Sequence, residues 1–585
     1  MPATPSSEDL DALLTRLETA RTRFGPGAAA QTMRLLGQIS RQQFHDAKSL
    51  LRFHEALLFL RAFPQGPSLV PRLEELLDAF HERVEKLQKL GVDMEVFDDF
   101  DTSGVAGTTM QDTVNFELAR WLARHLPRNV EIAWDGYEEE RAMAAAWPRF
   151  MPLLEEDADV EANIPWRQWL DAACGREQQL KWLIRHFERL PVSGRERAEL
   201  YDSLRLPIRW NLADLKLSRT RNWARPRAFY YHDEPLITRG QVSLAQELAR
   251  AAPRLRKLSR REGESILRTV REVMLVRYRE LYGTTLGDPG SVVRAEVGRG
   301  VVIHLWNLPP SRRLPLRAYV AGFTLKNGVP INYIEAIGLC EWIEVGFNTF
   351  YTYRQGETAW IYAQALRCLC AFTGATTISV YPYQIGQNND EALDSGAFWF
   401  YRKLGFRSGR ADLEELARRE GERIAADPRY RTPRKTLKRL AEAHVFYELP
   451  GSEWGAWDTF STRNLGLRVN RRMAREFGGD AARIREASVR EVTRALRVTP
   501  AGWSADQQRS LENWALVLGL IADLEKWSAR EKEKLIRIIR AQSGRGEMQY
   551  LRSTRRHERL RRELLQLGHP VPLGRGRKQI YHKGL

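Results

Sequence analysis

The sequence predicts an α+β protein in which a mixed sheet domain is embedded between a large, mostly helical N-terminal region and a basic helical C-terminal region. Apolar residues recur at helical spacing in residues 1–200 and after residue 410, whereas residues 301–353 are rich in β-branched and aromatic residues with a period near two. Because 585 residues exceed what one core usually holds, we expect several units. These are a helical domain at 1–200, a mixed extended and helical connector at 201–290, the sheet domain at 291–410 and the basic helical region at 411–585.

Composition favours a soluble cytoplasmic protein without a metal site. The four cysteines, at positions 174, 340, 368 and 370, show no Cys-x-x-Cys spacing, which argues against a zinc site or a disulfide framework. The first residues lack the basic and apolar segments of a signal peptide. The longest apolar run, from Trp514 to Ala522, is too short to cross a bilayer, so we expect no membrane partner.

Positive charge is concentrated towards the C-terminus. The formal net charge is +17, and residues 411–585 hold 37 Lys+Arg against 23 Asp+Glu, while residues 1–410 hold 54 against 51. Such a surface would attract an acidic protein, an acidic carrier or nucleic acid. No zinc finger, aromatic RNA-binding motif or clear helix-turn-helix accompanies it.

Two features of the first 290 residues suggest a ligand site, and for both we favour a structural role. A glycine turn rich in hydroxyls, residues 101–112, precedes an apolar helical run. A phosphate loop also needs a preceding strand and usually a lysine, so we expect Thr108 or Thr109 to cap the helix. His232, Asp233 and Glu234 are potential metal ligands, but adjacent residues of an extended chain point to opposite sides.

Residues 301–406 predict the sheet domain. Apolar runs at 301–306, 316–325 and 331–339 predict strands, and Asn327-Gly328 predicts a tight hairpin. A strand at 344–353 then leads through a glycine turn into a helix, followed by a strand at 376–381 and a final helix that ends in Lys403-Leu-Gly-Phe406. Beyond it we expect helices at 411–426, 434–443, 468–496 and 511–539.

The order of these elements and the ending Lys403-Leu-Gly-Phe406 resemble the GNAT acyltransferase superfamily over residues 295 to about 408. The resemblance implies a GNAT-like fold. It also implies direct transfer of an acyl group from acyl-coenzyme A, or from an acyl carrier, to an amine of an acceptor that the sequence does not identify. The N-terminus of the helix after the glycine turn would bind the pyrophosphate of the donor.

The resemblance also assigns residues. Tyr401 would protonate the departing thiolate, and a glutamate among Glu335, Glu341 and Glu344 would accept the amine proton. A backbone N–H of the strand before Gly356 would polarise the acyl oxygen. The donor-binding loop would consist of Arg354, Gln355, Gly356, Glu357, Thr358 and Ala359. We expect Asn388 and Asn389 to substitute for an asparagine that the family places near the donor.

Two departures from the family pattern leave alternatives open. Arg354 lies two residues before Gly356 and the next small residue, Ala359, lies three after it, and Asp394 stands where the family has an asparagine. One alternative is therefore a catalytically inactive GNAT-like binding or scaffold module. A second is a nucleic-acid-associated protein that uses the basic C-terminal region.

Overall fold

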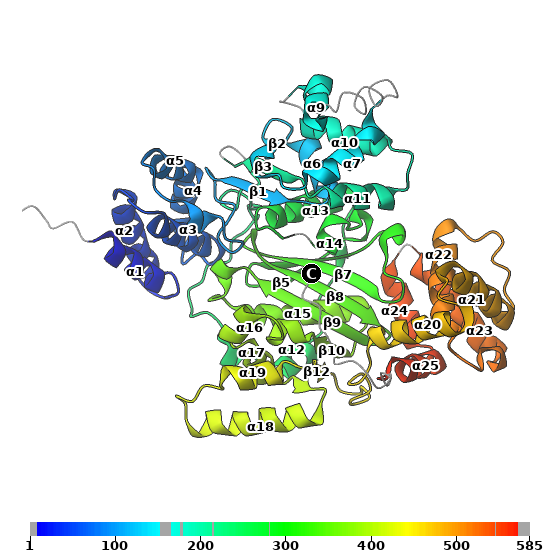
Figure 1. Ribbon diagram of the computed structural model, residues 1–585. Coiled ribbons are helices and arrows are strands. Elements are labelled where there is room, and N and C mark those ends of the chain that lie inside the picture. Colours follow the sequence, from blue (N-terminus) through cyan, green and yellow to red (C-terminus); the bar gives the residue numbers. More distant parts are fainter. Residues whose placement is uncertain are drawn as a thin grey trace, which may run out of the picture.

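A nine-stranded mixed sheet forms the centre of the molecule (Figure 1). The computed structural model describes residues 9–151, 165–175, 179–212, 216–279, 281–544 and 546–570. The strand order is β11-β12-β10-β9-β8-β7-β6-β5-β4, and neighbours are antiparallel except β9 and β10. The strands are β4 Arg256–Lys257, β5 Val293–Gly298, β6 Val301–Asn307, β7 Ala318–Lys326, β8 Val329–Leu339, β9 Trp342–Thr349, β10 Thr377–Val380, β11 Arg407–Ser408 and β12 Val445–Glu448.

The hairpin between β7 and β8 confirms the Asn-Gly prediction. Asn327 and Gly328 have φ angles of 48° and 77°, the left-handed backbone that such a two-residue turn requires. An added Cβ at Gly328 would lie 1.8 Å from the carbonyl oxygen of Ala224, so only glycine allows the turn to approach this segment. The hairpin is thereby fixed to the chain that precedes β4.

Helices cover both faces of the sheet. On one face Phe347 of β9 packs against Tyr362 of α15, with ring centroids 4.9 Å apart. On the other face Tyr319 of β7 lies 5.9 Å from Tyr282 of α14. In Figure 1, α12 and α15 to α17 lie below the sheet and α13 and α14 above it. These helices are α12 Leu244–Ala249, α13 Arg260–Leu275, α14 Tyr282–Thr285, α15 Thr358–Thr373, α16 Asp390–Asp394 and α17 Ala397–Lys403.

The N-terminal helices share the hydrophobic core of this sheet. Helix α3 is buried on nearly all sides, and it contacts β8 and the short helix η8 Tyr351–Tyr353. That short helix replaces the last three residues of the strand expected at 344–353. The helices are α1 Leu10–Ala20, α2 Ala28–Ser40, α3 Ala47–Ala62, α4 Leu69–Asp78 and α5 Phe80–Lys89.

A second hydrophobic core belongs to a three-stranded sheet of order β1-β3-β2, in which β3 falls in the stretch expected to be extended, whereas β1 and β2 were not expected. The expected threonine cap is wrong, because Thr109 begins β1 and Asn115 caps α6 by accepting from the Leu118 N–H. Asn115 follows the short strand and is the better acceptor at the helix start. The elements are β1 Thr109–Thr113, α6 Phe116–His125, β2 Val130–Ile132, α7 Glu140–Ala146, α9 Trp166–Cys174, α10 Gln179–Arg189, α11 Gly194–Ser203 and β3 Pro207–Asn211.

The C-terminal region is helical, but it also supplies strand β12 to the central sheet. The sheet thus includes strands from outside residues 291–410, since β4 precedes this range in the sequence and β12 follows it. The single helix expected at 468–496 is two helices, because Gly478 and Gly479 adopt left-handed backbone between them. The helices are α18 Ala411–Ala426, α19 Arg434–Leu440, α20 Thr462–Phe477, α21 Ala481–Leu496, α22 Ala505–Leu518, α23 Ala529–Gln542, α24 Glu547–Arg555 and α25 Glu558–Gly568.

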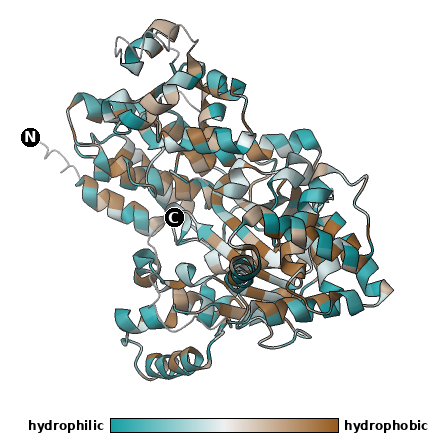
Figure 2. Ribbon diagram, turned by 45° about the vertical axis from the view of Figure 1, so that its right-hand side comes forward, coloured by the Kyte–Doolittle hydropathy of each residue, from teal (hydrophilic) through white to brown (hydrophobic). Residues whose placement is uncertain are grey.

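Most outer helices have one buried side and one solvent side. Teal and brown residues alternate along them in Figure 2, the pattern expected when an apolar stripe faces a core. Within the described residues, no helix combines the length and the apolar character that crossing a bilayer requires.

Candidate functional site

The parallel pairing of β9 and β10 ends part-way along β9, and we call the stretch of the β9 edge beyond it, which has no strand partner, the gap. Their pairing ends at Glu344 and Ser379, and β10 stops one residue later at Val380, whereas β9 continues to Thr349. The N–H of Phe350 bonds to the carbonyl of Ile331 on β8. Since backbone groups alternate along a strand, the N–H and C=O of Phe347 point to the gap side. An extended ligand in the gap would meet a free strand edge.

One face of β8 and β9 is partly open beside this gap. The pairs Glu335 with Gly346 and Ile337 with Glu344 lie on the face opposite Phe347, because side chains alternate along a strand. Up to residue 348, the partly exposed positions of the two strands all lie on this face, while the other positions are buried. We call this set the glutamate window, and it consists of Glu335, Ile337, Glu344, Gly346 and Asn348.

Glu335 is the member of the window with the least compensated charge. Its carboxylate accepts a hydrogen bond from the Tyr319 hydroxyl, and none of the described cations forms an ion pair with it. Burial raises the pKa of the Glu335 carboxyl, and the bond from Tyr319 opposes this rise. A carboxyl in such a place is suited to accept a proton from a bound amine.

Glu344 lies across the strand pair and is held by two partners. His444 Nε2 lies 2.8 Å from one carboxylate oxygen, and a guanidinium nitrogen of Arg317 lies 3.6 Å from the other. His444 in turn contacts Tyr381 edge-on, with centroids 5.3 Å apart. The ion pair with Arg317 leaves Glu344 better suited to position a substrate than to accept a proton.

Tyrosine side chains with 43 to 52% exposure surround this part of the sheet. Tyr282 contacts Tyr319, Tyr381 contacts His444, and Tyr351 lies two residues after the end of β9. Tyr383 belongs to the short helix η9 Pro382–Ile385, whose Gln384 amide would lie 3.7 Å from a Cβ at Gly346. Aromatic side chains with this exposure are typical of binding surfaces.

The glycine turn before α15 lies at the end of the gap and is packed by the N-terminal helices. A Cβ at Gly356 would lie 2.5 Å from the Phe63 ring, and Gln355 accepts a hydrogen bond from Arg21. Arg354 pairs with Glu391 of α16 at 2.5 Å and with Asp101 at 3.7 Å. The cation predicted to bind donor phosphate is therefore already neutralised.

The first turn of α15 has no side-chain cap, although it follows directly on the glycine turn. Glu357, at the N-cap position, is fully buried and pairs with Arg299 and, at 3.7 Å, with Lys326. The Thr358 hydroxyl donates to the carbonyl of Arg354, and Ala359 is buried. Backbone amides, and not side chains, are what this turn offers to an anion.

The predicted asparagines lie close to the turn through α16. Asn389 caps α16 by accepting from the Ala392 N–H, and Asn388 has a left-handed backbone with φ of 54°. Asp394, at the other end of α16, is neutralised by Arg434, so its charge would not repel a nearby phosphate. The pair of Arg354 with Glu391 connects this helix to the glycine turn.

Tyr401 and Glu341 lie apart from the glutamate window. Tyr401 is buried on the α15 side of the sheet, 5.7 Å from Tyr362, and burial raises the pKa of its phenol. Its hydroxyl group therefore stays protonated at neutral pH. Glu341 lies at the opposite end of β9, where Trp457 and Arg561 donate to it at 2.8 and 2.7 Å. We leave Glu341 out of the proposed mechanism.

The sequence did not reveal a series of ion-paired side chains that crosses this end of the sheet. Arg279 lies 3.6 Å from Asp101, and Asp101 also pairs with Arg354. Arg279 donates to the Tyr333 hydroxyl on β8 at 3.3 Å. Asp101 precedes Arg279 by more than 170 residues, and no sequence motif marks either, so only the fold brings them together.

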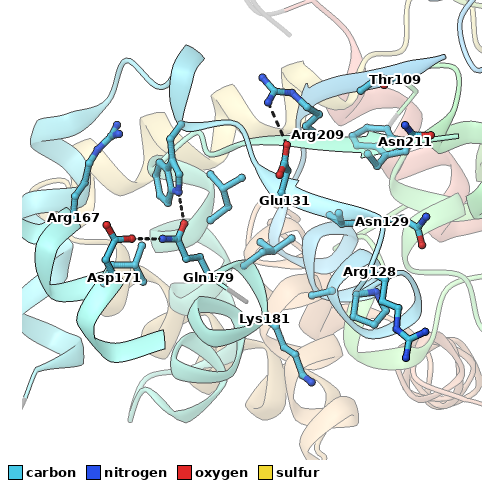
Figure 3. Close-up of a pocket in the computed structure, with 18 residues that line it drawn as sticks. Thr109, Arg128, Asn129, Glu131, Arg167, Asp171, Gln179, Lys181, Arg209 and Asn211 are labelled. Atoms are coloured by element: carbon cyan, nitrogen blue, oxygen red, sulfur yellow. Dashed lines mark hydrogen bonds and ion pairs between the residues drawn. The ribbon is translucent and has the colours of Figure 1, made fainter. Parts of the chain in front are cut away.

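A cavity of about 1120 Å³ lies against the β1-β3-β2 sheet (Figure 3). Its arginines are largely paired: Arg209 lies 2.6 Å from Asp135 and 3.2 Å from Glu131. Arg167 is neutralised by Glu140. Because it is built on the other sheet, this cavity is separate from the gap and the glutamate window.

The described residues contain no group of three or more His, Cys, Asp or Glu that could hold a metal ion. Comparison of the chain with protein-family models, curated proteins and solved structures finds no match.

Proposed function

We propose that the protein is an acyltransferase that moves an acyl group from an acyl thioester, either acyl-coenzyme A or a carrier-bound acyl group, to an amine. The observation that carries the proposal is the gap where the pairing of β9 and β10 ends. It has a free strand edge at Phe347, the glutamate window on one face and Tyr401 on the other side. The resemblance to GNAT acyltransferases implies roles for Tyr401, for one of the three glutamates and for a backbone N–H of the strand before Gly356, and the proposal assigns these roles to residues around the gap.

The gap fits the extended arm of a thioester donor better than the glycine turn fits its phosphates. An extended arm can pair with the edge of β9 as an added strand does. At the turn, the uncapped amides of α15 favour an anion, but Arg354 must first leave Glu391 and Asp101. A carrier-bound donor, which brings fewer charges to this turn, is thus as compatible as coenzyme A.

Residues of this chain would divide the work of direct transfer. Glu335 takes the proton of the amine as nitrogen bonds to the acyl carbon, and the Phe347 N–H stabilises the charge on the acyl oxygen. The carbon–sulfur bond breaks, and the Tyr401 hydroxyl donates a proton to the thiolate. Glu344, held by Arg317 and His444, positions the amine.

Calorimetric titration with acetyl-coenzyme A and longer acyl-coenzyme A tests donor binding, and a phosphopantetheine-linked acyl peptide tests the carrier form. With a donor that binds, Glu335→Gln should lower turnover by about 10²- to 10⁴-fold with little change in donor affinity. Tyr401→Phe should also lower turnover, whereas Tyr447→Phe, a tyrosine beside Phe406 on the same side of the sheet, should not. Unchanged turnover in both Glu335→Gln and Tyr401→Phe would contradict the mechanism.

One observation favours a second candidate, an inactive binding or scaffold module. Arg354 is neutralised and Phe63 packs against Gly356, so the turn is filled by the protein's own N-terminal helices. The absence of heat and of thermal stabilisation with both kinds of donor would favour this module over the enzyme.

A further inference from the structure

Helix α21 presents a row of arginines directly to solvent. At 100° per residue, Arg483, Arg490 and Arg494 fall within about 40° of one another and span about 17 Å of the helix. The buried residues of α21 lie on the opposite side, and they are Ile484, Ser488, Val492 and Leu496. All three arginines are exposed, and Arg497 at the C-cap extends the row. We call these four residues the arginine row.

The row lacks neutralising partners. None of its four guanidinium groups forms an ion pair or hydrogen bond with a described residue, although α21 also carries two glutamates. One of them, Glu491, pairs with Arg472 of α20 at 2.6 Å and is thus directed away from the row. The surrounding residues 461–570 contain 24 Lys+Arg against 13 Asp+Glu. Glu486, the other glutamate of α21, is exposed and lies one turn from both Arg483 and Arg490, so the four arginines with this glutamate keep a net charge of +3 (four minus one).

The surface also lacks the apolar anchors of a protein interface. The large apolar side chains that are exposed in the described part of the chain all lie outside α20 to α25. Protein interfaces concentrate their binding energy in buried aromatic and other large side chains, with charge depleted at the centre. A surface of arginines without such anchors suits a partner whose own surface is regularly charged.

We propose that the arginine row binds the phosphate backbone of nucleic acid without reading its sequence. Guanidinium groups donate to phosphate oxygens in a planar, bidentate geometry. A strand of duplex DNA carries one phosphate per about 3.4 Å of axis, so the row spans roughly five phosphates. This activity is separate from acyl transfer and does not depend on it.

The test is fluorescence anisotropy of the full chain with a labelled duplex of about 30 base pairs and random sequence, measured between about 50 and 200 mM salt. The triple variant R483Q/R490Q/R494Q removes three cations, and Arg497 is kept because its φ of 57° is left-handed. The slope of log affinity against log salt should fall by about 2.7, so that the unmodified chain loses roughly 40-fold more affinity across this range than the variant.

The matched control is R418Q/R419Q/R423Q on α18, which removes the same charge from exposed arginines that pair with glutamates. It should leave the salt slope nearly unchanged, and circular dichroism should show both variants folded. The proposal would be overturned if the salt slope fell equally in both variants, or if it did not fall in R483Q/R490Q/R494Q. Displacement of the labelled duplex by a polyglutamate peptide as readily as by unlabelled duplex would also overturn it, because the partner would then be an acidic protein.

Discussion

Glu55 of α3 and Arg219, which lies in the segment before β4, form an ion pair in the protein interior. The carboxylate accepts from the guanidinium, and Thr352 of η8 bonds to both partners. The side chains of Arg219 and Glu55 are only 1% and 9% exposed. The pair therefore joins the N-terminal helices to the turn that leads into α15.

Removing one partner of this pair should destabilise the whole protein. Arg219→Met leaves a buried carboxylate without its cation and should lower the free energy of unfolding by about 3–5 kcal/mol. This free energy is measured by urea unfolding, with tryptophan fluorescence as the signal. Arg195→Met, at an exposed pair with Glu199, is the control and should leave the free energy of unfolding nearly unchanged. A similar small loss for Arg219→Met would show that the pair does not support the fold.

The same cluster should make stability fall in acid. Burial alone would raise the pKa of Glu55, but Arg219, His54 and Thr352 outweigh it and lower this pKa from 4.5 to about 2. Its stabilising contribution is thus complete above pH 4.5 and is lost as the pH falls to about 2. Thermal midpoints measured across this range should fall less steeply for Glu55→Gln, and equal slopes would contradict the assignment.

Gly356→Ala should show whether Phe63 limits the glycine turn. The added methyl group would lie 2.5 Å from the ring, which should cost about 1–3 kcal/mol. A smaller side chain in Phe63→Leu should recover part of this loss, so a double-mutant cycle should give a coupling energy of about 0.5–3 kcal/mol. Additive losses would indicate that the turn can move away from α3.

Glu335→Gln should stabilise the protein while it removes the proposed base. The pKa of Glu335 is higher in the folded chain, so its ionised form is disfavoured there and stability is lost as the pH rises through this raised pKa. The variant should therefore unfold at a higher temperature than the unmodified chain at pH 8, with the difference vanishing near pH 4. Scanning fluorimetry at both pH values measures it. A lower midpoint at pH 8 would show that the carboxylate is stabilising.

Local signals in the sequence were sufficient to predict the hairpin at Asn327 and the helix that ends at Lys403, because turn chemistry and periodicity act over a few residues. They were not sufficient for β12, four residues long, or for the β1-β3-β2 sheet, whose short strands lack a clear alternation. Short strands acquire their state from the neighbours with which they pair, and those neighbours are distant in sequence.

The candidate site likewise combines features that local sequence signals predict with features that depend on distant residues. Glu335 and Glu344 were candidates by residue type, but their common face depends on the register of β8 with β9. The turn between these strands contains Cys340, whose φ is 55°, and no glycine or asparagine marks it. Register sets which side chains share a face, so without a turn signal Glu341 could not be distinguished from the other two. Asp101 and Arg354 could be joined only by the tertiary fold.

The position of β12 has a consequence for synthesis on the ribosome. Among the described strands, β11 pairs with β12 alone, and β12 lies between β11 and β10. Until residues 445–448 have left the exit tunnel, β10 has an unpaired edge and β11 has no strand to join. Completion of the central sheet beyond β10 must therefore wait for translation of α18 and α19, and during that delay a chaperone or another nascent chain can reach the bare edge of β10.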